Sequence, residues 1–263
     1  MADGAPDTRS ERFSTGRVFS RAFGTFAANP VAAVGIALLF GALPSWGYDY
    51  AYDHLFPPGS SSALLIGKGL TQSIGATLFA TLAQGIFVRL TLAHEEGRRP
   101  SFTEAGQTGA RALLPLVGLG LVMSVATTIG LIMLVVPGVF MLLMWAVAAP
   151  VLVEERHGIR AALRGSATLA EGSWGSILGI SLIVVLVESA AAYLLTRVLE
   201  GYYGASAFLL VAREPFPVLY LSVQLVIDTI TATLSAAVYT SLYVELRNFK
   251  HGTPKDALVE IFA

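Results

Sequence analysis

The chain has 263 residues, of which 54% are hydrophobic and only 13% are charged, with a net charge of -1 and no cysteine. Soluble domains carry about 25% charged residues, so this composition excludes an ordinary soluble protein and indicates an integral membrane protein. The net charge offers no bulk attraction to nucleic acid, and the missing cysteines exclude disulfides and thiolate chemistry.

The N-terminal segment "MADGAPDTRSERFSTGR" is polar and lacks a short apolar core before a small-residue cleavage site, so we expect no removable signal peptide. We expect residues 1–14 to form a disordered arm and residues 15–263 to form a single membrane domain. Directly after the arm, apolar side chains recur at helical spacing beside two arginines, which predicts an amphipathic helix lying in the headgroup layer. Its predicted membrane-surface residues are Phe19, Phe23, Phe26, Arg17 and Arg21.

Six later stretches are long and apolar enough to cross a bilayer, which takes roughly 20 residues of helix. They are Pro30 to Trp46, Ala63 to Thr91, Leu113 to Val136, Pro137 to Val153, Trp174 to Val198 and Pro217 to Leu246. Between the third and the fourth, Pro137 and Gly138 predict a tight turn, because both residues continue a helix poorly. We therefore expect an all-α membrane protein whose six helices form three hairpins.

Basic residues gather on one side of this arrangement. Of the 17 lysines and arginines, all but Lys68, Arg197 and Arg213 fall before the first span, from the end of the second span to the start of the third, between the fourth and fifth spans, or after the sixth. The positive-inside rule therefore predicts that both termini lie in the cytoplasm. The aromatic stretches "SWGYDYAY" and "EGYYG" fall at the opposite boundary, where amphipathic rings settle.

Three membrane helices are followed by a similar pattern, in which a charged patch leads to Gly97, Gly158 or Gly252 and then to a short helical segment. Glycine just past a helix end is the usual stop, and basic side chains near it complement the helix dipole. Together with the N-terminal helix, these segments predict four amphipathic helices on the cytoplasmic surface. The alternative interpretation is ordinary polar loops of similar composition.

The passage "PGVFMLLMWAVAAPVLVEERHGIRAALRGSATLAEGSW" and the later "VYTSLYVELRNFKHG" resemble the membrane domain of bacterial glycerophosphoryl diester phosphodiesterases and of related stand-alone six-helix inner-membrane proteins. The residues that carry the resemblance are Pro137, Gly138, Trp145, Pro150, Val151, Glu154, Glu155, Gly158, Ala162, Leu163, Arg164, Ser166, Gly172 and Trp174. The resemblance implies a location in the bacterial inner membrane. It does not imply activity, because the phosphodiesterase chemistry of that family belongs to a separate soluble barrel.

Catalytic motifs are absent from the sequence. The four histidines are scattered among predicted loops, without the spacing of metal ligands. No nucleophile elbow, phosphate-binding loop or dinucleotide fingerprint occurs. We therefore expect no enzyme activity, no metal and no cofactor.

Glu188 and Asp228 are the acidic residues deep within predicted spans, where a charge costs at least about 2.5 to 3.5 kcal/mol. Counting residues from the outer ends of the fifth and sixth helices places the two acids at a similar depth. Polar residues at helical spacing accompany them on the second and sixth helices. The candidate ligand or ion pathway comprises Glu188, Asp228, Gln224, Thr231, Ser235, Gln84 and Thr81.

These residues leave two interpretations open. Either they line a polar cavity that binds a proton, a cation or a polar head group, or the acids are neutral and hydrogen-bond between helices as structural elements. For the whole protein we consider a non-catalytic module that organises lipids or partner proteins at the inner face. We expect its partners to be membrane lipids, with a protein partner or a homo-oligomer as a second possibility, and we expect no binding to nucleic acid. The alternative is a small transporter or ligand-binding membrane protein that uses the paired carboxylates, and an enzyme ranks third.

Overall fold

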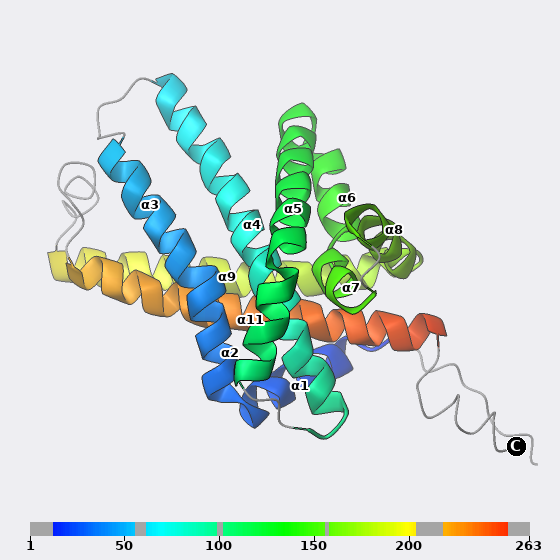
Figure 1. Cartoon of the computed structure of the whole chain (residues 1–263). Helices are drawn as coiled ribbons and strands as arrows, with labels where there is room; N and C mark the ends of the chain where they lie inside the picture. Colours follow the sequence, from blue (N-terminus) through cyan, green and yellow to red (C-terminus); the bar gives the residue numbers. More distant parts are fainter. Residues whose placement is uncertain (1–12, 56–61, 99–101, 156–157, 204–217, 252–263) are drawn as a thin grey trace, which may run out of the picture.

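The computed structural model describes residues 13–55, 62–98, 102–155, 158–203 and 218–251, and every regular element in this part of the chain is a helix (Figure 1). The elements are α1 (Thr15–Ala28), α2 (Pro30–Ala37), the π-helix η1 (Leu38–Ala42), α3 (Leu43–Leu55), α4 (Ser62–Glu95), α5 (Phe102–Met133), α6 (Val135–Met144), α7 (Ala148–Glu155), α8 (Ile159–Ala170), α9 (Trp174–Tyr203) and α11 (Val218–His251). The predicted all-α class is confirmed.

Six segments are long and apolar enough to cross a membrane, and each overlaps one of the six predicted stretches. They are Pro30–Tyr48, Gly69–Glu95, Arg111–Met133, Val135–Glu155, Trp174–Val198 and Ser222–Lys250. Their surfaces remain largely apolar where they do not touch other helices, as on α9, where Leu186 and Leu194 are more than half exposed. The chain is a multi-pass membrane protein.

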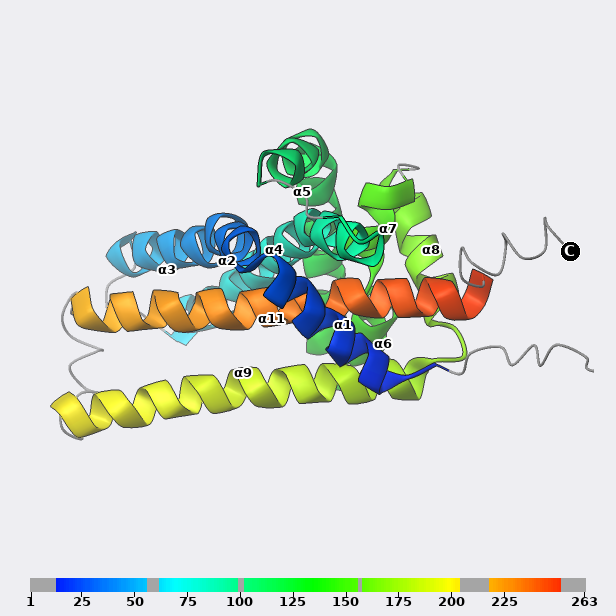
Figure 2. The ribbon, with the colours of Figure 1, turned by 90° about the horizontal axis from the view of Figure 1, so that it is seen from below.

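Helices α4 and α11 form the centre of the packing. Figure 1 shows α11 and α9 running across α4 and α5, and Figure 2 shows α9 alongside α11, with α1 crossing in front of α11. Side chains on α4 such as Phe87 and Leu90 are fully buried, as are Leu242 and Tyr243 on α11. Helix α9 has far fewer protein neighbours, because the predominantly apolar face opposite α11 is left for lipid.

The first span is not a regular α-helix. Residues Leu38–Ala42 form a π-helix, in which the amide of Leu43 donates to the carbonyl of Leu38, between α2 and α3. π-Helical turns widen the backbone locally and are frequent at functional sites. Gly41 lies in this turn, and a Cβ atom there would stand 3.4 Å from the Cβ of Ala232 on α11 and 3.7 Å from that of Ala83 on α4. The irregular turn is thus packed closely against two other spans.

The turn between the third and fourth spans falls at Leu134 and not at Pro137 and Gly138, which corrects the sequence prediction. Leu134 has an extended backbone (φ -162°, ψ 136°), and Pro137 sits in the first turn of α6, where its missing amide proton is harmless. Gly138 serves a different purpose. A Cβ atom on it would lie 2.6 Å from the backbone nitrogen of Leu131, so glycine is needed because α5 and α6 touch at their backbones.

The fourth predicted span is broken in the middle. Helix α6 ends at Met144 and α7 begins at Ala148, which leaves backbone groups unpaired inside an apolar segment. Ser166 of α8 satisfies two of them: its hydroxyl donates to the carbonyl of Met144 at 2.9 Å and accepts from the amide of Val147 at 3.3 Å. Ser166 is fully buried, so α8 closes the break in the span.

The four segments predicted to form surface helices differ from one another in the structure. Helices α1 and α8 exist, and each buries one face against protein: Val18 and Ala22 of α1, and Ala162 and Leu169 of α8. The segment after Gly97 is no separate helix, because α5 continues from Phe102 without a break to Met133. The predictions for the disordered arm up to residue 12 and for the last surface helix after residue 252 lie outside the described residues.

Candidate functional site

A cavity of about 390 Å³ lies between the first, second, fifth and sixth spans. We call it the interhelical cavity. Its lining comprises Gly41, Ala42, Ser45, Ala76, Phe79, Ala80, Ala83, Gln84, Glu188, Ala192, Gln224, Ile227, Asp228, Thr231, Ala232, Ser235 and Ala236. The alanines of α4 recur at helical spacing, so this face of α4 is made of small residues and leaves room for the cavity.

Six of the seven predicted pathway residues meet at this cavity. Helix α11 contributes Gln224, Asp228, Thr231 and Ser235, which follow one another at intervals of three or four residues. Glu188 on α9 and Gln84 on α4 face the same space. Thr81 does not line it: it is buried, donates a 2.7 Å hydrogen bond to the carbonyl of Thr77, and lies toward Gly120 of α5.

Each acidic side chain has one polar neighbour. The hydroxyl of Ser235 donates to Oε1 of Glu188 and links α11 to α9. The side-chain amide of Gln224 donates to Oδ1 of Asp228 at 2.8 Å, within α11. A second link between α11 and α9 is the bond from the Tyr239 hydroxyl to Ser181 at 3.3 Å. The acids are therefore partly satisfied by neutral donors.

The other oxygen of each carboxylate, Oε2 of Glu188 and Oδ2 of Asp228, makes no hydrogen bond within the described residues. Neither acid forms an ion pair in this part of the chain, and no hydrogen bond joins them to each other. A carboxylate can accept several hydrogen bonds. Each acid thus retains accepting capacity at the cavity wall.

Sequence reasoning missed part of the lining. The first span contributes Gly41 and Ala42 from the π-helix and Ser45 from α3, and α4 contributes Phe79. A π-helical turn has no sequence signature, so nothing indicated that the first span would open toward the acids. The available signal was the series of small residues on the second helix, which includes Ala76 and Ala80.

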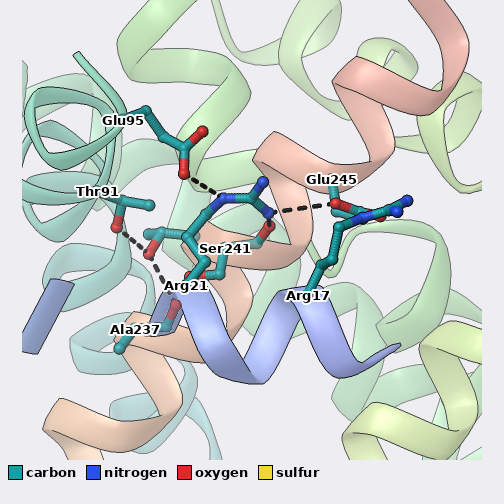
Figure 3. A network of polar contacts seen from close by, with 8 residues as sticks. Arg17, Arg21, Thr91, Glu95, Ala237, Ser241 and Glu245 are labelled. Carbon is teal, nitrogen blue, oxygen red and sulfur yellow. Dashed lines mark hydrogen bonds and ion pairs between the residues drawn. The ribbon is translucent and has the colours of Figure 1, made fainter. Parts of the chain in front are cut away.

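The predicted membrane-surface residues of α1 are divided between two environments. Phe23 and Phe26 are exposed (59% and 39%), whereas Phe19 packs partly against the core. Arg17 and Arg21 do not point away from the protein. Figure 3 shows both guanidinium groups directed at carboxylates of other helices. We call the set of Arg17, Arg21, Glu95 and Glu245 the α1 clasp.

The clasp joins three helices through Glu245 of α11, whose side chain is only 3% exposed. Nε and Nη2 of Arg17 both contact Oε1 of Glu245, at 2.8 and 2.7 Å, and the backbone amide of Ser14 donates to the same oxygen at 3.1 Å. Arg21 lies between two acids, with Nη1 at 3.3 Å from Oε2 of Glu245 and Nε at 2.5 Å from Oε1 of Glu95 on α4. Helix α1 is thereby fixed across α4 and α11.

One helical turn before Glu95 on α4, the hydroxyl of Thr91 shares a buried hydrogen bond with the hydroxyl of Thr240 on α11, and the two oxygens lie 2.8 Å apart. Glu245 was not singled out from the sequence, although the i, i+4 spacing of Arg17 and Arg21 places both cations on one helix face, which favours a shared anionic partner.

The described residues include no group of three or more histidine, cysteine, aspartate or glutamate side chains that could hold a metal ion. The cavity has acceptors and neutral hydroxyl and amide groups, which suit binding by hydrogen bonds and charge. No family model matches the chain. No solved structure matches it either.

Proposed function

We propose that this protein is a non-catalytic bacterial inner-membrane protein that binds a small polar ligand or ion in the interhelical cavity and moves it across or within the membrane. One observation supports this over a scaffold: seven polar residues from four spans, including both intramembrane acids, line a single cavity. Intramembrane carboxylates are costly to insert, and those of transporters commonly face cavities.

The π-helical turn is further support. Functional sites are enriched in such turns, and here Leu38–Ala42 supplies Gly41 and Ala42 to the cavity wall. The proposed topology has both termini in the cytoplasm and three hairpins, which places the α1 clasp at the cytoplasmic end. The resemblance to the six-helix inner-membrane domain supports the proposed location but assigns no ligand.

The test is native mass spectrometry of the detergent-extracted protein, followed by uptake assays in proteoliposomes with any molecule that it carries. Ala80→Phe fills the cavity from α4, and Val226→Phe adds the same ring to an exposed position on α11 as a matched control. We expect Ala80→Phe to abolish ligand retention and Val226→Phe to leave it unchanged. Equal retention in both variants, with equal melting temperatures, would mean that the cavity holds no ligand.

The second candidate function is the organisation of membrane lipids or partner proteins at the cytoplasmic face. It is favoured by the exposure of Phe23 and Phe26 on α1, since exposed aromatic side chains suit a membrane interface or a protein surface. It is weakened by the α1 clasp, because Arg17 and Arg21 are occupied by Glu95 and Glu245. Replacing Phe23 and Phe26 with serine should remove partners under this function and leave cavity binding intact.

A further inference from the structure

The ionisable side chains that line the interhelical cavity in the described part of the chain are all acidic. Among the described residues that line it, Glu188 and Asp228 are the ionisable ones, and none is a lysine, an arginine or a histidine. An anion entering this space would meet carboxylates without a compensating cation, and the low dielectric of the membrane interior strengthens that repulsion. The lining therefore disfavours phosphate, sulfate and carboxylate groups.

The free hydrogen-bonding groups of the lining favour a ligand that donates hydrogen bonds. Glu188 and Asp228 each keep one oxygen without a partner among the described residues, and the Gln84 side chain, which can both donate and accept, likewise makes no hydrogen bond there. The donors in the lining are partly used already, because Ser235 and Gln224 donate to the two acids. The cavity thus has spare acceptors, which a group with several N–H bonds would satisfy.

A bare metal ion fits the cavity poorly. Ca²⁺ takes six to eight oxygen ligands and Mg²⁺ requires a near-ideal octahedron, whereas the described residues contain no cluster of three metal-binding side chains. The volume of about 390 Å³ exceeds what one ion occupies. Alanine and glycine make up eight of the seventeen lining residues, with Phe79 and Ile227 as the larger apolar side chains, and these surfaces suit the apolar body of an organic molecule.

We propose that the cavity recognises a protonated amine carried on a short apolar body, with Glu188 and Asp228 as its acceptors and Phe79 and the alanines against its carbon chain. This inference rests on the proposed function and adds the chemical class of the ligand. The same chemistry occurs in a free aminoalkane and in the ethanolamine headgroup of a lipid. A charge-assisted hydrogen bond to a carboxylate is stronger than a neutral one, so the amine outcompetes an alcohol of equal length.

The experiment measures binding of three four-carbon probes to the purified full chain by isothermal titration calorimetry: 1-aminobutane, butan-1-ol and butanoate. We expect 1-aminobutane to bind and the other two to bind at least about tenfold more weakly, as the loss of one charge-assisted hydrogen bond implies. Glu188→Gln and Asp228→Asn should each weaken 1-aminobutane by a similar factor. Glu171→Gln removes an exposed acid outside the cavity and should leave binding unchanged.

The outcomes separate this inference from the proposed function. If butanol or butanoate binds as well as the amine, and Ala80→Phe abolishes that binding, the amine class is wrong and the cavity function stands. If the amine binds equally to Glu188→Gln, Asp228→Asn and the native chain, the assigned acceptors are wrong. If no probe binds and native mass spectrometry finds no molecule that Ala80→Phe removes, both fail.

Two further arms identify the source of the amine. Binding of 1-aminobutane to lipid-free protein in detergent supports a free amine. Stoichiometric retention of phosphatidylethanolamine, but not of phosphatidylglycerol, from mixed vesicles supports the headgroup, and 1-aminobutane should displace that lipid. Circular dichroism and melting temperatures of each variant show whether it is folded, and the conservative amide substitutions preserve side-chain size.

Discussion

Arg21 and Glu245 are 224 residues apart in the sequence, yet Nη1 of the arginine lies 3.3 Å from Oε2 of the glutamate. This contact, together with the two contacts of Arg17 to the same glutamate, holds α1 against the end of α11. Both Glu245 and the Arg21 side chain are largely buried (3% and 11% exposed). Such a pair is less screened by solvent than an ordinary surface ion pair.

We expect Glu245→Gln to lower stability by about 2 to 3 kcal/mol, because two buried or half-buried arginines lose a charged acceptor. Hydrogen exchange of residues 15–28 should rise at the same time, since α1 loses its attachment to α11. The control is Glu171→Gln, an exposed acid whose removal should have no effect. A double-mutant cycle with Arg21→Met measures the coupling, and additive effects would mean that the pair contributes nothing specific.

The break between α6 and α7 gives a second prediction. Ser166→Ala leaves the carbonyl of Met144 and the amide of Val147 without their partner in a buried place, so we expect a loss of about 1 to 3 kcal/mol in the free energy of unfolding. Thr168→Ala is the matched control, since it removes an exposed hydroxyl from the same helix. Thermal unfolding in detergent distinguishes them, and equal melting temperatures would show that the break tolerates unpaired backbone groups.

The contact between α5 and α6 gives a third prediction. In Gly138→Ala the new methyl group would lie 2.6 Å from a backbone nitrogen of Leu131, which cannot rotate away, so the helices must separate at a cost of about 1 to 3 kcal/mol. Gly179→Ala on α9 is the control, because nothing lies within 4 Å of its added methyl group and alanine favours a helix over glycine. A Gly138→Ala variant as stable as the native chain would contradict this packing.

The attachment of α9 to α11 gives a fourth prediction. Ser235 bonds Glu188 and Tyr239 bonds Ser181 across this pair of helices. Interhelical hydrogen bonds in membranes contribute about 0.6 kcal/mol on average, so the double variant Ser235→Ala and Tyr239→Phe should lose roughly 1 kcal/mol. Thr196→Ala, whose exposed hydroxyl bonds only its own helix, is the control. The distribution of distances measured between spin labels on α9 and α11 should broaden in the double variant alone.

Hydropathy and spacing were sufficient to predict the six spans and most of one cavity wall. The spans follow from length and composition, and the i, i+4 spacing of Gln224 and Asp228 places both on one face of α11 whatever surrounds that helix. The partners across the cavity were not predictable in this way. The position of the first span against α11 depends on the π-helical turn and on close packing at Gly41, which are tertiary features without a local pattern.

The predicted position of the turn was wrong for a physical reason. Pro137 and Gly138 suggested a turn because both residues are poor helix formers, but a proline is tolerated in the first helical turn and a glycine also permits close helix packing. A separate omission concerns Arg17 and Arg21, whose amphipathic helix predicted contact with lipid headgroups and indicated no carboxylate partner. The identity of the partner depends on Glu245, and hydropathy gave no information about which residue would face the arginines.

The break in the fourth span also constrains how the protein is made. Met144 precedes Ser166 by 22 residues, so α6 and α7 leave the ribosome before the serine that completes their hydrogen bonding. Until α8 is synthesised and docks, two backbone groups in this apolar segment have no protein partner, and water or the insertion machinery must solvate them. The segment therefore matures only after the chain that follows it has emerged, and a truncation before residue 166 should stay bound to the insertion machinery longer than one that ends after α8.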